Sequence, residues 1–108
     1  MDQLKKNNIF DEIDITLQDA IKKWPNWVYM SDALNIISEE IGEMIQACNQ
    51  YNYENGDKKE IKKEALQSAA MIIRFLMNFD NYERKTNFLK WVNSKCFKGN
   101  KIYVKKIL

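Results

Sequence analysis

Three glutamates within five residues, Glu39, Glu40 and Glu43, are the side chains in this sequence best suited to chemistry. Apolar residues recur at helical spacing around them, which predicts a helix over residues 31–53. On this helix Glu40 and Glu43 lie one turn apart and project together, with Glu39 on the outer side. Like charges at this spacing destabilise a helix, as does Gly42. We therefore expect a divalent cation here, with Gly42 permitting close approach of a neighbouring helix; the alternative is a solvated helix face.

A second acidic group follows on the next predicted helix, over residues 57–79. Its apolar side chains cover most of the helical circumference, which is typical of a central, buried helix. One stripe is polar except for a methionine, and it contains Glu64, Gln67, Met71, Arg74 and Asn78. Because a buried charge must be paired or bind a metal, we expect the two helices to form an antiparallel hairpin in which Glu64 and Gln67 face Glu40 and Glu43. The stripe argues against a solvated face.

Other side chains near these glutamates have two interpretations each. Arg74 lies about two turns beyond Gln67, where it could bind a phosphate or form an ion pair with a glutamate. The rings of Trp24, Trp27 and Tyr29 could stack on a base or close one end of a helical bundle.

Histidine is absent from the sequence. Its absence excludes Ser-His-Asp and Cys-His nucleophiles, histidine-ligated zinc and the Glu-x-x-His pairs of di-iron bundles. The two cysteines, Cys48 and Cys96, stand alone, so we expect buried free thiols rather than a zinc cluster or a redox pair. Chemistry in this chain would depend on carboxylates and a hard metal ion.

Helical spacing extends over most of the 108 residues, so residues 1–108 are predicted to form a single all-α domain. We expect four helices, at about residues 9–23, 31–53, 57–79 and 80–97. The final residues, 102–108, could form a short strand, a docked arm or a frayed tail.

The predicted helices begin and end at recognisable signals. The first ends at Trp24-Pro25, because the residue before a proline avoids the helical region. Further signals are an N-cap at Ser31 or Asp32, a turn at Asn55-Gly56 with Gly56 in the left-handed region, capping-box spacing at Asp57 with Glu60 and at Asp80 with Glu83, and a break at Gly99-Asn100.

Charge is unevenly distributed along the chain. Residues 84–108 carry eight of the 17 basic residues and none of the 15 acidic ones, although the net charge is only +2. We describe residues 98–108 as a basic C-terminal tail. The lysines of residues 84–108 could follow a nucleic-acid backbone, but we expect a solvated tail, or an arm docked on the acidic half of a partner subunit.

No segment is long and apolar enough to span a membrane. The first eight residues contain no apolar core, so we expect no signal peptide and a cytoplasmic location.

The acidic residues also carry a family resemblance. Residues 39–43 have the pattern E-E-x-x-E, and residues 64–67, E-A-L-Q, stand at the place of E-x-x-D. This arrangement resembles the all-α nucleoside triphosphate pyrophosphohydrolases, the group of MazG, the dimeric dUTPases and phosphoribosyl-ATP pyrophosphohydrolase. Residues 64–76 are also similar to small MazG-like proteins of phage genomes. The resemblance covers residues 24–79.

The resemblance implies a helical bundle and a Mg²⁺-dependent attack of water on the α-phosphorus of a nucleoside triphosphate. Mn²⁺ could replace Mg²⁺, and the products would be a monophosphate and pyrophosphate. By position, Glu40, Glu43 and Glu64 match metal ligands, and Glu39 matches the carboxylate that positions or activates water. Gln67 stands where the family has aspartate, and its carbonyl could still bind Mg²⁺ with one negative charge fewer. Arg74 and Trp27 are candidate substrate-binding residues.

Two classes of function remain open at this point. One is an enzyme of nucleotide-pool clean-up, and the other is a nucleotide-binding or protein-interaction module without turnover, which Gln67 keeps open. Because the third helix is apolar nearly all round, we expect a homo-oligomer, a dimer or a tetramer, that completes a larger bundle.

Overall fold

The computed structural model describes residues 2–85 of the chain. These residues form three α-helices, α1 (Asp2–Lys23), α2 (Met30–Tyr53) and α3 (Lys58–Met77), followed by the short 3-10 helix η1 (Phe79–Asn81). The only β-type pairing in this part of the chain is an isolated bridge between Tyr29 and Glu83. The all-α prediction is therefore confirmed for residues 2–85.

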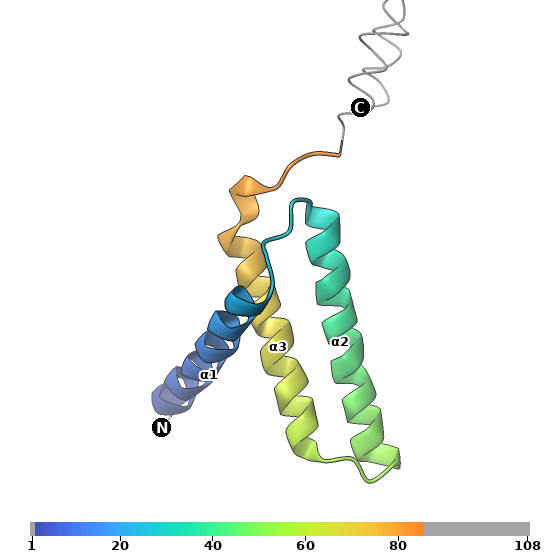
Figure 1. The fold of residues 1–108 in the computed structure, drawn as a ribbon. Coiled ribbons are helices and arrows are strands. Elements are labelled where there is room, and N and C mark those ends of the chain that lie inside the picture. Colours follow the sequence, from blue (N-terminus) through green and yellow to red (C-terminus); the bar gives the residue numbers. More distant parts are fainter. Residues whose placement is uncertain (1, 86–108) are drawn as a thin grey trace, which may run out of the picture.

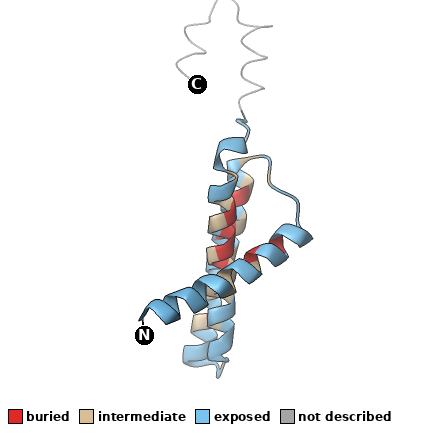
Figure 2. Ribbon diagram, turned by 90° about the vertical axis from the view of Figure 1, so that its left-hand side faces the viewer, coloured by how far each residue is buried: buried red, intermediate tan, exposed pale blue. Residues whose placement is uncertain are grey.

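Helices α2 and α3 form the antiparallel hairpin that the sequence predicts, and α1 lies across α3 on one face of it (Figures 1 and 2). The core is small and lies where the three helices meet. It consists of Leu17 and Ala20 from α1, Ile37 from α2, and Ala70 and Met71 from α3. The small side chain of Ala70 is fully buried, so the helices can pack closely at this position.

Helix α1 begins at Asp2, seven residues earlier than its apolar periodicity predicts, and it ends at Lys23 as expected. The added residues are exposed, so burial does not specify them. They are held by local effects instead. Asp2 lies at the positive end of the helix dipole, and Gln3 donates a hydrogen bond to Asn7 one turn later (3.0 Å).

The predicted N-cap of α2 at Ser31 or Asp32 is wrong. The helix begins at Met30, and the extended residue Tyr29 precedes it without a side-chain cap. A tertiary contact sets this boundary: Tyr29 pairs with Glu83, and the Glu83 amide donates to the carbonyl of Val28 (2.9 Å). This contact outweighs the local N-cap signal of Ser31 and Asp32.

The turn between α2 and α3 contains the predicted residues in different roles. Asn55, not Gly56, has positive φ (58°). Gly56 is needed for close approach, because a Cβ atom there would lie 2.9 Å from the carbonyl carbon of Gln50. Asp57 caps α3 as predicted, with Oδ1 accepting from the Lys59 amide (2.9 Å).

The predicted fourth helix does not begin at Asp80. After the single 3-10 turn, Tyr82 is extended and its ring stacks on Phe75, with centroids 5.5 Å apart. This stacking and the pairing of Glu83 turn the chain back against the loop before α2, which overrides the capping-box spacing. Residues 86–97 of the predicted helix, Cys96 and the basic tail at 98–108 lie outside the described residues.

Among residues 2–85, helix α3 is buried on only one side, which differs from the prediction of a central helix. Its Ile72 and Leu76 are 40% and 61% exposed, and Ile45 on α2 is 57% exposed. In the described part of the chain Gly42 does not meet a neighbouring helix either, because a Cβ atom there would meet nothing within 4 Å. Between residues 2 and 85, no helix has the length and apolar character needed to cross a bilayer.

Arg74 joins α3 to the end of α1. Its side chain is 1% exposed. It donates to the carbonyl oxygens of Trp24 (2.6 Å) and Ala20 (3.4 Å) and to Asn26 Oδ1 (3.1 Å), and its guanidinium carbon lies 4.9 Å from the ring centroid of Trp27. A cation at the carbonyl end of a helix is favourable. The ion pair with a glutamate considered from sequence is not formed.

We expect Arg74→Leu to lower the free energy of unfolding by about 3 kcal/mol, because buried carbonyls would lose charged hydrogen-bond donors. Urea denaturation followed by circular dichroism measures this change. Arg74→Lys should give an intermediate loss, and Arg84→Leu, at an exposed position, serves as the control. Equal midpoints for wild type and Arg74→Leu would contradict this role.

Candidate metal centre

Three carboxylates converge where α2 and α3 pack together. One oxygen from each of Glu40, Glu43 and Glu64 lies within 4.8 Å of the other two. Glu40 and Glu43 are one turn apart on α2, and the short turn at residues 54–57 places the first half of α3 opposite them. The structure thus brings together the residues that helical spacing selects in the sequence.

Gln67 completes this group from α3. With its amide nitrogen facing the carboxylates, Nε2 lies 3.1 Å from Glu40 Oε2 and 3.2 Å from Glu64 Oε2, and it donates to both. In this orientation the amide is a neutral bridge between two acids on different helices. A half-turn about the terminal torsion would place the carbonyl oxygen at the same position, where it could bind a cation.

Burial and neighbouring carboxylates raise the pKa of two members of this cluster. Burial raises the pKa of Glu40, and the charges of Glu43, Glu64 and Glu39 raise it further. Burial also raises the pKa of Glu64, as do a hydrogen bond with Glu43 and the charge of that residue, while Lys63 acts in the opposite direction. A bound cation would offset the part of these shifts that comes from repulsion between the carboxylates. Carboxylate and amide oxygens are ligands that Mg²⁺ prefers.

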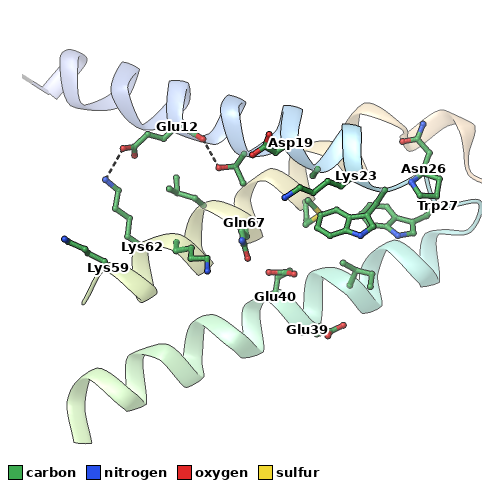
Figure 3. A pocket seen from close by; sticks show the side chains of 18 residues that line it. Glu12, Asp19, Lys23, Asn26, Trp27, Glu39, Glu40, Lys59, Lys62 and Gln67 are labelled. Carbon is green, nitrogen blue, oxygen red and sulfur yellow. Dashed lines mark hydrogen bonds and ion pairs between the residues drawn. The ribbon is translucent and has the colours of Figure 1, made fainter. Parts of the chain in front are cut away.

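A hollow of about 780 Å³ lies beside this cluster, between α1, α2 and α3 (Figure 3). Glu39, Glu40 and Gln67 contribute to its wall. Glu43 and Glu64 line a second, smaller hollow of about 280 Å³ instead. The carboxylate cluster therefore lies between two openings, and Glu40 is the member that faces the larger one.

The larger hollow contains some of the predicted binding residues but not all of them. Trp24 and Trp27 line it, whereas Tyr29 and Arg74 do not. Tyr29 contacts the Lys85 ammonium, 4.9 Å from its ring centroid. Arg74 is buried behind Trp27, so its position supports a structural role rather than contact with a phosphate.

Sequence reasoning missed most of the charged residues that line this hollow. Lys59, Lys62 and Lys63 come from α3, and Glu12, Asp19 and Lys23 come from α1. Lys63 precedes Gln67 by four residues, and Lys59 precedes Lys62 and Lys63 by three and four, a helical spacing that could have found them. Nothing in the sequence pairs α1 with this site.

Comparisons with protein families, curated proteins and solved structures found no match to this chain. The geometry of the cluster and the hollow is therefore the basis for the functional argument.

We expect Glu43→Gln to raise the melting temperature of the metal-free protein at neutral pH, because one of three repelling carboxylates is removed. The same variant should lose most of the stabilisation that Mg²⁺ gives the wild type, since binding to the native state stabilises it by mass action. Asp11→Asn, at an exposed position on α1, is the control. Equal Mg²⁺-induced shifts in wild type and Glu43→Gln would argue against the metal site.

The pH dependence follows from the raised pKa values of Glu40 and Glu64. A carboxyl whose pKa is higher in the folded state binds its proton more tightly there, so the folded state is favoured at low pH. The contribution of these two groups is fully present below their ordinary pKa of 4.5. It is lost as the pH rises through the raised values. Thermal melts of wild type and Glu40→Gln without metal should show a weaker pH dependence in the variant.

Proposed function

We propose that this protein is a Mg²⁺-dependent nucleoside triphosphate pyrophosphohydrolase, which hydrolyses a ribo- or deoxyribonucleotide to monophosphate and pyrophosphate. The observation that carries the proposal is the convergence of Glu40, Glu43 and Glu64 beside a hollow that has aromatic and basic walls. The proposed setting is nucleotide-pool clean-up in the cytoplasm.

In this proposal Glu40, Glu43, Glu64 and Gln67 hold the ion through side-chain oxygens, and water fills its other positions. When bound, Mg²⁺ or Mn²⁺ offsets the charge that develops on the phosphate and favours ionisation of water. The four side chains come from two packed helices, so their positions are set before substrate enters.

Glu39 is the candidate general base. It is exposed, and it lines the hollow beside Glu40. The oxygen of water bonds to the α-phosphorus and the bond to the bridging oxygen breaks. The bonding pair leaves with pyrophosphate, and Glu39 accepts the proton that water loses.

Trp27 is the candidate contact for the base, with Trp24 beside it in the hollow. Arg74 supports this contact indirectly, because its guanidinium lies over the Trp27 ring and donates to Asn26. We therefore assign Arg74 to positioning the aromatic wall.

A second candidate function is binding of a nucleotide or a partner protein without turnover. The observation that favours it is the position of the Gln67 amide, whose nitrogen, when turned toward the carboxylates, donates hydrogen bonds to Glu40 and Glu64. These bonds relieve part of the repulsion without a cation, so the hairpin has a metal-independent way of holding its acids together.

We also propose self-association, as a homodimer or a homotetramer that completes a helical bundle. Apolar side chains stay exposed at helical spacing on both helices of the hairpin: Leu34, Ile41 and Ile45 on α2, and Ile72 and Leu76 on α3, with Phe79 of η1 next in line. Helix α1 covers neither row. A second copy would bury surface that one chain leaves in water.

With Mg²⁺ present, the wild type should release pyrophosphate from at least one member of a nucleoside triphosphate panel. Glu40→Gln should lower the rate about 100-fold or more, because loss of a ligand removes several kcal/mol of transition-state stabilisation. Colorimetric pyrophosphate detection measures this, and Asp11→Asn is again the control. Equal rates in wild type and Glu40→Gln would refute the assignment.

Gln67→Asp separates the two functions. In an enzyme, the added charge should tighten Mg²⁺ binding and leave activity measurable. In a binding module, both wild type and Gln67→Asp should be inactive on every nucleotide with Mg²⁺ or Mn²⁺. Magnesium titration followed by thermal melting gives the affinity independently of turnover.

Ile45→Glu should convert the oligomer to a monomer at micromolar concentration, because it places a charge in the apolar row of α2. Asn35→Glu, at an exposed position on another side of α2, should leave the assembly intact. Light scattering measures the mass. A wild type that is monomeric would exclude the proposed assembly.

A further inference from the structure

The walls of the larger hollow change in character along its length. On α3 the lining residues run from Lys59, Lys62 and Lys63 through Gln67 to Met71. One helical turn, about 5 Å, separates Lys63 from Gln67, and another separates Gln67 from Met71. In Figure 3, Lys59 and Lys62 lie at one end, Trp27 and Asn26 at the other, and Gln67 and Glu40 between them.

Helix α2 gives the same order independently. Its lining residues are Glu39 and Glu40, next to Gln67, and then Ile36. Because α2 and α3 are antiparallel, Ile36 lies toward the Met71 end of the hollow. The hollow therefore has a basic end, an acidic centre and an aromatic end.

The lysines at the basic end are only weakly neutralised by the protein. Lys62 pairs with Glu12 (3.2 Å), which ties α3 to α1, and Lys63 lies 4.0 Å from Glu60. Lys59 forms no ion pair with residues 2–85. Exposed pairs of this kind contribute little to stability, so the ammonium groups stay available to an anion that enters the hollow.

We infer that the basic end binds the β- and γ-phosphates of the substrate, so that the nucleotide lies along α3 with its base at the tryptophans. This inference rests on the proposed function. It places the α-phosphorus beside Glu40 and Gln67, at the centre. The leaving pyrophosphate then departs toward Lys59 and Lys63, whose charges offset the negative charge that it carries away.

The charge of the lining decides what can bind. Four carboxylates (Glu12, Asp19, Glu39, Glu40) and four ammonium groups (Lys23, Lys59, Lys62, Lys63) line the hollow, and Glu43 and Glu64 lie behind Glu40. An anionic ligand is therefore favoured only when a cation accompanies it. Of the nucleotides, the triphosphate complexed with Mg²⁺ meets both the acidic centre and the basic end, whereas a monophosphate lacks the groups for the basic end.

Calorimetric titration with inorganic pyrophosphate in the presence of Mg²⁺ tests the basic end without turnover. The variant Lys59→Gln/Lys63→Gln should bind pyrophosphate about tenfold more weakly or worse, because two charged contacts are lost. It retains Lys62, and with it the pair to Glu12. The matched control is Lys58→Gln, which changes the neighbouring lysine outside the hollow and should change binding less than about twofold.

Titration with the four common ribonucleoside monophosphates tests the direction of the substrate. The double lysine variant should bind the monophosphates as wild type does. Trp27→Leu should weaken monophosphate binding and leave pyrophosphate binding unchanged. Wild-type protein that fails to bind pyrophosphate, equal pyrophosphate binding by all lysine variants, or equal losses for both ligands would each overturn the inference.

The inference and the proposed function fail in different ways. If the protein hydrolyses a nucleotide but binds pyrophosphate equally well without the lysines, the inference is wrong and the proposed hydrolase function stands. If pyrophosphate binding depends on the lysines but no nucleotide is hydrolysed, the proposed hydrolase function is wrong and the basic end remains a polyphosphate-binding site.

Discussion

The arrangement of this molecule depends on the buried guanidinium of Arg74. It is the point at which α3 holds the carbonyl end of α1 and the loop that carries Trp27. Without it, α1 would be joined to the hairpin by a small apolar core and by the exposed pair of Lys62 with Glu12. Since α1 forms one wall of the larger hollow, the Arg74 contacts also fix the width of the candidate substrate site.

The carboxylate cluster, in contrast, opposes the packing of α2 against α3. Packing α2 against α3 brings Glu40, Glu43 and Glu64 together, and burial together with the repulsion between the carboxylates raises the pKa of Glu40 and of Glu64. Gln67 relieves part of that repulsion through two hydrogen bonds, and a divalent cation would relieve more. An aspartate at this position would add a further negative charge to the cluster, so the hairpin without a cation would be less stable.

The two faces of the hairpin have different tasks in the proposed function. One face, together with α1, surrounds the hollow with its basic, acidic and aromatic parts. The exposed apolar rows of α2 and α3 are the surface proposed for a second copy. Because the same two helices serve both, association of two chains would also hold the carboxylates of each hairpin in place.

The sequence by itself determined the helical class, the hairpin of α2 and α3, and the convergence of Glu40, Glu43, Glu64 and Gln67. These features follow from apolar periodicity and a short turn, which are local properties. Only the tertiary structure decided the first residue of α2, the extended course of residues 82–83, the partners of Arg74 and the residues of α1 that line the hollow. Each of these depends on contacts between distant segments, such as Arg74 with Ala20, 54 residues away. Burial of such contacts outweighs local capping signals, whose contribution is only about 1 kcal/mol.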